Sequence, residues 1–295
     1  MRPTRFCWIF ILAVSGLAAA SEPSFEYERA RPFDLQETGV RQEGDVALRE
    51  VSYAALDGSR NAATIVAGKM SSAARPAILF VHWFGPPAPT SNRTQFIPDA
   101  IELGKEDAVS LLIDTPWSDS EYFEKRTRDG DYARSVQQVK DLRRALDVLR
   151  SQPSVDQARV AFVGHDFGAM YGVLAASVDP RVRAFVFMAG TRSFSDWFLY
   201  GPPKLTGGAK ESFIAELAPL DPIRYLPRLK TPILLQFGDR DFHVSNERAK
   251  ALAEAAPEPK TVLTYATEHE LNEEATRDRI AWLKKQLMNK PDRKS

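Results

Sequence analysis

Residues 164–168 read Gly-His-Asp-Phe-Gly and place a carboxylate between two glycines, after a strand-like run at 161–163 and before a helix of small residues at 169–177. In a strand-to-helix turn this tight, side chains in place of the glycines would collide with neighbouring backbone. The N–H groups at the start of the helix favour a negative charge. Asp166 is therefore a candidate nucleophile, and an ordinary helix cap in a tight turn is the alternative interpretation.

Two further groups follow in an order that suits hydrolysis. Asp241 belongs to residues 238–244, Gly-Asp-Arg-Asp-Phe-His-Val, directly after the apolar run 233–237. His269 follows a second apolar run at 261–265. Because groups just past the carboxyl ends of parallel strands meet at one edge of a sheet, we expect both to approach Asp166. Asp241 would hold the imidazole of His269 in one tautomer, and His269 would act as general base on water.

Nucleophile, acid and histidine in this chain order resemble the α/β-hydrolase superfamily, over essentially all of the chain after residue 20. The stretch 132–172, where a long helix at 135–146 leads into the strand before the turn, resembles dienelactone hydrolases and prolyl-oligopeptidase-like esterases. Those enzymes carry Ser or Cys where this chain has Asp166. The turn itself is similar to that of epoxide hydrolases and haloalkane dehalogenases, whose nucleophile is Asp.

The chemistry of a carboxylate separates these possibilities. Attack on an ester carbonyl would form a mixed anhydride, whereas attack on the saturated carbon of an epoxide or haloalkane forms an ordinary ester that His269-activated water can cleave. The leading prediction is an exported hydrolase that forms a covalent ester on Asp166, acting on epoxides or haloalkanes. The alternatives are a dienelactone hydrolase-like esterase or lactonase that uses Asp166 as a base for water, and a non-catalytic binding protein of the same fold.

The resemblance also implies groups that receive the leaving atom. Epoxide hydrolases use tyrosine hydroxyls, for which Tyr200 and Tyr225 are the candidates here. Haloalkane dehalogenases use indole N–H groups, for which the candidates include Trp197 and Trp117, while Phe167 beside the nucleophile has no side-chain donor.

An oxyanion hole is expected from the loop 80–87, Phe-Val-His-Trp-Phe-Gly-Pro-Pro, after a strand at 77–81. Its position matches the family's His-Gly-x-Pro loop. The backbone N–H of Trp83 or Phe84, together with that of Phe167, would stabilise a tetrahedral intermediate.

The first residues resemble a secretory signal peptide. Arg2 and Arg5 precede an apolar run at 6–17, and Ala18-Ala19-Ala20 offers a cleavage site after Ala20. We therefore expect a periplasmic or secreted protein. Cys7, the only cysteine, lies inside this segment, so a thiol nucleophile and an internal disulfide are excluded from the processed chain.

The composition argues against several classes of binding partner. Equal numbers of acidic and basic residues, 39 of each, predict no binding to nucleic acid or to anionic membranes. The 4 histidines lack metal-binding spacing, so neither a metal nor a cofactor is expected. A small-molecule substrate is the expected partner.

Apolar runs alternate with helical patterns along the chain and predict an α/β fold with a mostly parallel eight-stranded sheet and helices on both faces. The expected strands are 46–54, 62–67, 77–81, 109–113, 160–163, 184–189, 233–237 and 261–265. The expected organisation is a signal peptide at 1–20, an N-terminal arm at 21–45, and a hydrolase domain at 46–290 with a short cap insertion at about 191–225.

Overall fold

The computed structural model describes residues 22–69, 73–200 and 204–288. The predicted signal peptide at residues 1–20 lies outside these residues and stays a prediction. None of the described helices is long and apolar enough to cross a membrane.

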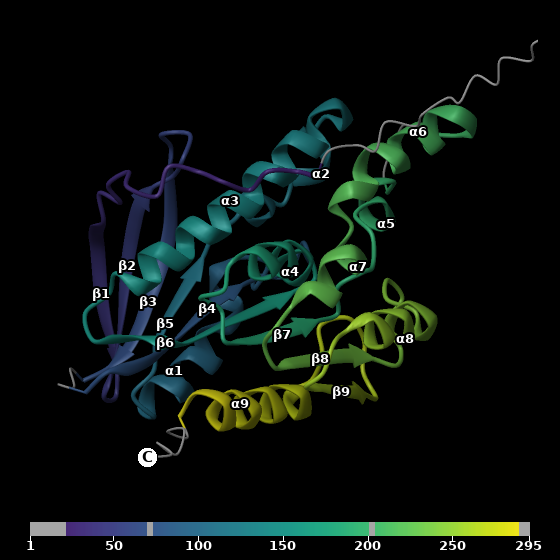
Figure 1. The fold of residues 1–295 in the computed structure, drawn as a ribbon. Coiled ribbons are helices and arrows are strands. Elements are labelled where there is room, and N and C mark those ends of the chain that lie inside the picture. Colours follow the sequence, from purple (N-terminus) through teal and green to yellow (C-terminus); the bar gives the residue numbers. More distant parts are fainter. Residues whose placement is uncertain (1–21, 70–72, 201–203, 289–295) are drawn as a thin grey trace, which may run out of the picture.

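A single mixed sheet forms the centre of the described chain (Figure 1). Its strands lie in the order β1-β2-β3-β5-β4-β6-β7-β8-β9. The first three pairs in this order, β1-β2, β2-β3 and β3-β5, are antiparallel. The remaining pairs, from β5-β4 to β8-β9, are parallel. The strands are β1 (Gln36–Glu43), β2 (Val46–Ala54), β3 (Arg60–Gly68), β4 (Arg75–Val81), β5 (Val109–Ile113), β6 (Val155–His165), β7 (Ala184–Met188), β8 (Ile233–Gly238) and β9 (Lys260–Tyr265).

Helices cover both faces of the sheet, as predicted (Figure 1). Helices α1 and α9 pack on one face, and α3, α4 and α8 pack on the other. Short helices α5, α6 and α7 lie in the connection between β7 and β8, where the cap was expected. The α-helices are α1 (Ile97–Lys105), α2 (Tyr122–Lys125), α3 (Asp131–Arg150), α4 (Phe167–Val178), α5 (Ser195–Phe198), α6 (Gly207–Leu217), α7 (Pro222–Tyr225), α8 (Asn246–Ala255) and α9 (Glu273–Leu287).

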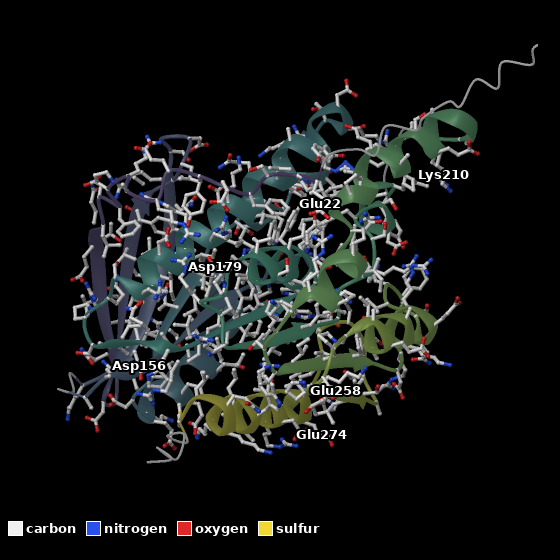
Figure 2. The ribbon with its side chains drawn as sticks, viewed as in Figure 1. Glu22, Asp156, Asp179, Lys210, Glu258 and Glu274 are labelled. Atoms are coloured by element: carbon white, nitrogen blue, oxygen red, sulfur yellow. The ribbon has the colours of Figure 1, made fainter. Side chains whose placement is uncertain are left out.

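The parallel strands are apolar on both faces because helices shield each face from water. In β4, Leu79 belongs to the core under α3 and α4, whereas Ile78 and Phe80 belong to the core under α1 and α9. Charged side chains such as Glu258 lie at the outside of the ribbon (Figure 2). Asp179 is the labelled exception, since it is buried and accepts hydrogen bonds from Arg181 at 2.5 and 2.6 Å.

The sheet has nine described strands, so the prediction of eight was wrong by one. The additional strand, β1, lies inside the segment expected to be an N-terminal arm, and it pairs antiparallel with β2 at the edge of the sheet. Almost all of its side chains are exposed, so it lacks the apolar alternation by which a strand is recognised in sequence.

Candidate active site

The turn between β6 and α4 holds Asp166 in a strained conformation. Its φ angle is 52°, in the left-handed region that residues other than glycine seldom adopt. A Cβ atom at Gly164 would lie 2.3 Å from the carbonyl oxygen of Gly168, and one at Gly168 would lie 2.2 Å from that of Val81. The steric requirement predicted for the two glycines is confirmed.

Asp241 and His269 form a hydrogen-bonded pair at the same edge of the sheet. His269 Nδ1 lies 2.7 Å from Asp241 Oδ2. The other oxygen of Asp241 accepts from the backbone N–H groups of His243 at 2.7 Å and Val244 at 2.9 Å. A carboxylate held by two backbone donors can fix the ring orientation of its histidine.

Asp166 completes the group. Its Oδ1 and the Nε2 of His269 are both buried and have no hydrogen-bond partner among the described residues. Buried polar atoms are normally paired, so two such atoms in one place indicate a site that a substrate or a water molecule completes.

One of the predicted oxyanion donors, the N–H of Phe84, already contacts the Asp166 carboxylate. The N–H of Phe84 donates to Asp166 Oδ2 at 3.2 Å, and the N–H of Phe167 stabilises the charged form of the same carboxyl. The N–H of Trp83 instead donates to Gln95 Oε1 at 2.9 Å. Of the two donors left open by the sequence, Phe84 therefore faces the site and Trp83 does not.

Burial dominates the electrostatics of Asp166. It raises the pKa of this carboxyl from 3.8 to about 7, although the His269 charge and the N–H groups of Phe84 and Phe167 act in the opposite direction. Desolvation penalises the charged form of any carboxyl. A carboxyl with a pKa near neutrality can exchange a proton under ordinary conditions.

The other two groups shift towards their charged forms. Burial acts against the charge of Asp241, but the hydrogen bond and charge of His269 and two backbone donors leave its pKa below the usual value. Burial also acts against the charge of His269, yet its hydrogen bond to Asp241 and the charge of Asp166 raise its pKa above 6.5. The three groups thus form one coupled acid–base system.

A family model, "Dienelactone hydrolase family", matches residues 119–274, which is more than half of the 295-residue chain and includes all three of these groups. The chain belongs to the dienelactone hydrolase family. Asp166 departs from the Ser or Cys that dienelactone hydrolases carry at this position.

Two curated proteins are similar to part of the chain. The chain is 29% identical over 158 residues to dipeptidyl-peptidase 5 of Porphyromonas gingivalis, covering 48% of this chain and 22% of the relative. It is 27% identical over 121 residues to the acylamino-acid-releasing enzyme of Mus musculus, covering 37% and 16%. The chain thus aligns with about a fifth of the length of these curated relatives.

Solved structures show the same fold. The acetyl xylan esterase from Paenibacillus sp. R4 superimposes with a TM-score of 0.71 at 16% identity, covering 87% of this chain and 90% of that one. Membership of the dienelactone hydrolase family favours the dienelactone hydrolase-like esterase or lactonase alternative. The expectation of epoxide or haloalkane chemistry finds no support in these relatives.

The structure separates the predicted substrate contacts into two groups. The Trp197 ring lies 5.8 Å from the His269 ring and 5.7 Å from the Phe167 ring, and its buried Nε1 has no partner among the described residues. Tyr200 is 47% exposed, and its ring packs 5.8 Å from Trp197. Both therefore lie at the site.

Trp117 and Tyr225 do not offer their polar groups to the site. The Trp117 indole donates to the His82 carbonyl at 3.0 Å, so it is a buried support beneath Phe167. The Tyr225 hydroxyl donates to the Pro219 carbonyl at 2.9 Å, and its ring packs on Phe25. The ring of each residue packs into the core, and its polar group donates to one backbone carbonyl. Composition and spacing cannot predict whether such a polar group faces the site or a nearby carbonyl.

Two polar side chains beside Asp166, Asp241 and His269 were not predicted as site residues. Gln95 bridges Trp83 and His165, and His165 Nε2 lies 2.9 Å from the carbonyl oxygen of His269. Gln95 is far from the triad in sequence and belongs to no motif, so only the folded chain reveals it. His165 directly precedes Asp166, and this adjacency was a signal that the sequence did carry.

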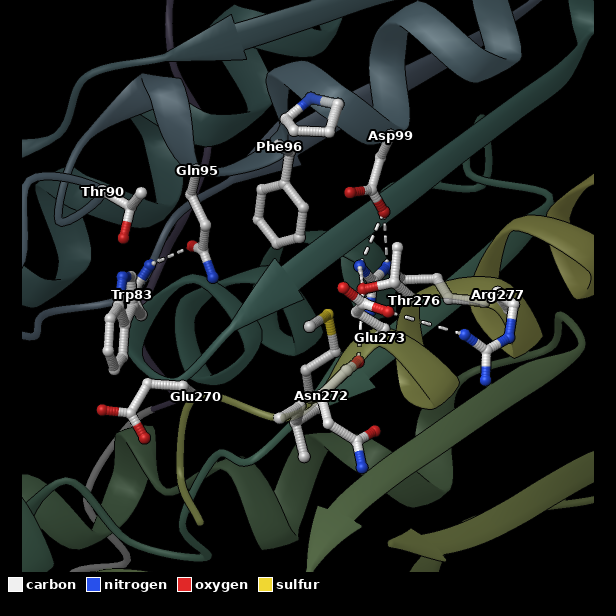
Figure 3. Close-up of a pocket in the computed structure, with 14 residues that line it drawn as sticks. Trp83, Thr90, Gln95, Phe96, Asp99, Glu270, Asn272, Glu273, Thr276 and Arg277 are labelled. Carbon is white, nitrogen blue, oxygen red and sulfur yellow. Dashed lines mark hydrogen bonds and ion pairs between the residues drawn. The ribbon is translucent and has the colours of Figure 1, made fainter. Parts of the chain in front are cut away.

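A cavity of about 780 Å³ opens next to this bridge, on the side of α1 and α9 (Figure 3). Trp83, Gln95 and Glu270 line one end of it, and the buried ion pair of Asp99 and Arg279, 2.6 Å apart, lies at the other. Asp166 and His269 are not among its lining residues. No described cluster of three or more His, Cys, Asp or Glu side chains could hold a metal ion.

Proposed function

We propose that this protein hydrolyses small carboxylic esters or lactones, with Asp166 as base for water, His269 as acid and Asp241 as the group that orients His269. One observation carries the proposal. Asp166 Oδ1 and His269 Nε2 are buried without partners, and the pKa of Asp166 is raised to about 7 beside a histidine whose pKa is also raised. Near neutral pH, such a pair can keep Asp166 ionised as the proton acceptor and His269 protonated as the proton donor.

The reaction follows from these roles. Ionised Asp166 takes a proton from water while the water oxygen bonds to the carbonyl carbon of the ester. The tetrahedral intermediate then breaks its bond to the alcohol oxygen, which takes the proton of His269. The acid and the alcohol leave, and transfer of the proton from Asp166 to His269 restores the starting state.

Asp241 acts through His269. Its hydrogen bond at 2.7 Å keeps a proton on Nδ1 and stabilises the charged ring, so that Nε2 is the atom that donates to the leaving group. This division of labour avoids the mixed anhydride that direct attack of Asp166 on an ester carbonyl would require.

A second candidate is attack of Asp166 on a saturated carbon, and one contact favours it. Because Phe84 N–H holds Oδ2, the other oxygen of the carboxylate is left as the attacking atom. The same N–H would then stabilise the intermediate when the resulting ester is hydrolysed. In ester hydrolysis, by contrast, the substrate carbonyl must displace Oδ2 from this donor.

On the substrate side, we propose that Trp197 and Tyr200 contact the bound molecule. The indole Nε1–H of Trp197 can only donate, so an oxygen acceptor of the substrate would be its partner. We also propose export through the N-terminal segment, with cleavage after Ala20, on the basis of its charge and apolar pattern.

The two routes place the oxygen of water in different molecules. In a single turnover in ¹⁸O-labelled water, with protein in excess over 4-nitrophenyl acetate or styrene oxide, the general-base route places the label in the product acetate and leaves Asp166 unlabelled. Covalent displacement places the label in the Asp166 carboxyl, which peptide mass spectrometry detects.

Trapping gives a complementary test. His269→Gln protein incubated with epoxides, haloalkanes and activated esters should remain unmodified if Asp166 acts as a base. An adduct mapped to Asp166 would support the second candidate and overturn the first. If the wild-type protein turns over none of these substrates, both candidate reactions are contradicted and a binding protein is favoured.

A further inference from the structure

Gln95 joins two loops of the active site through a single amide. Its Oε1 accepts from the backbone N–H of Trp83 at 2.9 Å, as Figure 3 shows. Its Nε2 lies 2.6 Å from His165 Nδ1. The amide therefore links the loop after β4 to the turn that carries Asp166.

These contacts determine the tautomer of His165. A backbone N–H can only donate, so the Gln95 atom facing Trp83 must be the oxygen, and the NH₂ group must face His165. An NH₂ group can only donate, so His165 Nδ1 accepts and carries no proton. The proton of the neutral ring is on Nε2, which donates to the carbonyl oxygen of His269 at 2.9 Å.

The surroundings keep His165 neutral and pack its ring on both Trp83 and the core. Burial lowers the pKa of this imidazole well below its usual value, and the His269 charge acts in the same direction. Its ring stacks on Trp83 at 5.3 Å with an interplanar angle of 4°. The donor to the His269 carbonyl is thus present throughout the ordinary pH range.

We propose that Gln95 and His165 are positioning residues for His269: the amide of Gln95 selects the Nε2–H tautomer of His165, which anchors the backbone of His269 and so aligns its ring with Asp241. The inference rests on the proposed role of His269. These hydrogen bonds connect the loop after β4, which carries Trp83, to the turn at Asp166 and to the loop after β9, which carries His269. A displacement of about 1 Å at a reacting group can cost about 10²-fold in rate, so such an anchor matters for catalysis.

The tautomer can be measured without any substrate. In protein labelled with ¹⁵N-histidine, two-bond ¹H–¹⁵N correlations distinguish the two neutral tautomers, and His165→Phe assigns the signal. We expect a neutral ring protonated on Nε2 from about pH 5 to about pH 8, because the pKa lies well below the usual value. A proton on Nδ1, or titration within this range, would overturn the proposal.

The same spectra report the effect on His269. His165→Phe keeps an aromatic ring against Trp83 but removes the donor, and Gln95→Leu removes both contacts of the amide. In each variant we expect the raised pKa of His269 to fall, because its hydrogen bond to Asp241 loosens. Gln236→Leu is the matched control, since it removes a buried amide that donates to the Ala275 carbonyl at 2.7 Å.

Kinetics complete the test with 4-nitrophenyl acetate as the probe. His165→Phe and Gln95→Leu should lower kcat by about 10–100-fold, with KM little changed. Gln236→Leu should lower Tm but leave kcat and the pKa of His269 unchanged. An unchanged pKa of His269 in His165→Phe would overturn the positioning role, whether or not the probe is hydrolysed. Failure of wild-type protein to hydrolyse the probe would count against the proposed function alone.

Discussion

The carboxyl groups of Asp166 and Asp241 both interact with His269, yet the protein surrounds them differently. Asp241 accepts two backbone N–H groups on one oxygen and the His269 ring on the other, and its pKa is lowered. Asp166 accepts backbone donors but leaves Oδ1 without a partner, and burial raises its pKa to about 7. Hydrogen bonding determines the direction of the pKa shift at Asp241, and desolvation determines it at Asp166.

The difference supports the proposed roles of the two aspartates. A carboxylate that stays charged suits the orientation of a histidine, whereas one that titrates near neutrality suits proton transfer. Asp166 and Asp241 can therefore have different roles beside the same histidine, one in proton transfer and the other in orientation.

The largest expected effect is on turnover. Asp166→Ala removes the carboxylate proposed to take a proton from water, so hydrolysis of 4-nitrophenyl acetate should fall by at least about 10²–10⁴-fold, the usual contribution of a general base. Stopped-flow or steady-state rates on purified protein measure this. Near-normal activity would remove Asp166 from the mechanism.

Asp241→Asn should reduce kcat by about 10²–10⁴-fold while leaving substrate binding nearly intact. The amide turns an NH₂ group towards His269 Nδ1, which forces the ring into the wrong tautomer and lowers its pKa. Histidine NMR of the variant checks the tautomer directly. A full rate with an altered tautomer would show that orientation by Asp241 is dispensable.

The pH dependence should follow the coupled pair. Because Asp166 must be ionised and its pKa is raised to about 7, kcat/KM should rise with pH up to about 7, well above the range of an ordinary carboxyl. The rate should fall again at higher pH as His269 loses its proton. Asp241→Asn should move this second fall to lower pH. A flat profile from about pH 5 to about pH 9 would contradict both roles.

Stability should respond in opposite directions at the two sites. Between pH 3.8 and about 7 the folded protein keeps the Asp166 proton that the unfolded chain has released, so stability falls as pH rises. The full shift corresponds to on the order of 4 kcal/mol at higher pH. Asp166→Asn removes this cost but buries an N–H without an acceptor, at about 1–3 kcal/mol.

We therefore expect Asp166→Asn to raise the free energy of unfolding by about 2 kcal/mol near about pH 8. The gain should vanish near about pH 5 and become a loss of about 2 kcal/mol near about pH 4, where only the cost of the buried N–H remains. Asp241→Asn should lower it at neutral pH, because the folded state there favours the charged carboxylate. Urea unfolding across this range measures both. Equal changes of the same sign would show that the two environments are alike.

The smallest effect is expected at Tyr225, which lies outside this acid–base system. Tyr225→Phe removes the hydrogen bond to the Pro219 carbonyl and should cost about 1 kcal/mol of stability. Ester hydrolysis should be unchanged, because no contact places the hydroxyl at the triad. A large loss of activity would return Tyr225 to the site.

Local patterns were sufficient to predict much of the fold. The apolar runs that became β4, β5 and β8 are buried on both faces, so hydrophobicity alone marks them. Strand β1 was missed because its contribution is backbone pairing with β2, and backbone pairing leaves no pattern in an exposed strand. The same limitation applies to Trp117 and Tyr225, whose polar tips turned to nearby carbonyl groups instead of the site.

By itself, the sequence predicted that Asp166, Asp241 and His269 meet at one edge of the sheet, and it predicted the glycines that the turn at Asp166 requires. Each of these residues lies in a local pattern at the end of a strand, so the sequence could reveal it. It also determined that the residue at the nucleophile position is a carboxylate. Only the tertiary structure decided that Phe84 rather than Trp83 faces Asp166, and that Gln95 reaches His165. It also decided that burial separates the pKa of Asp166 from that of Asp241. Desolvation and hydrogen bonding depend on atoms that are distant in the chain, so they arise only when the chain has folded.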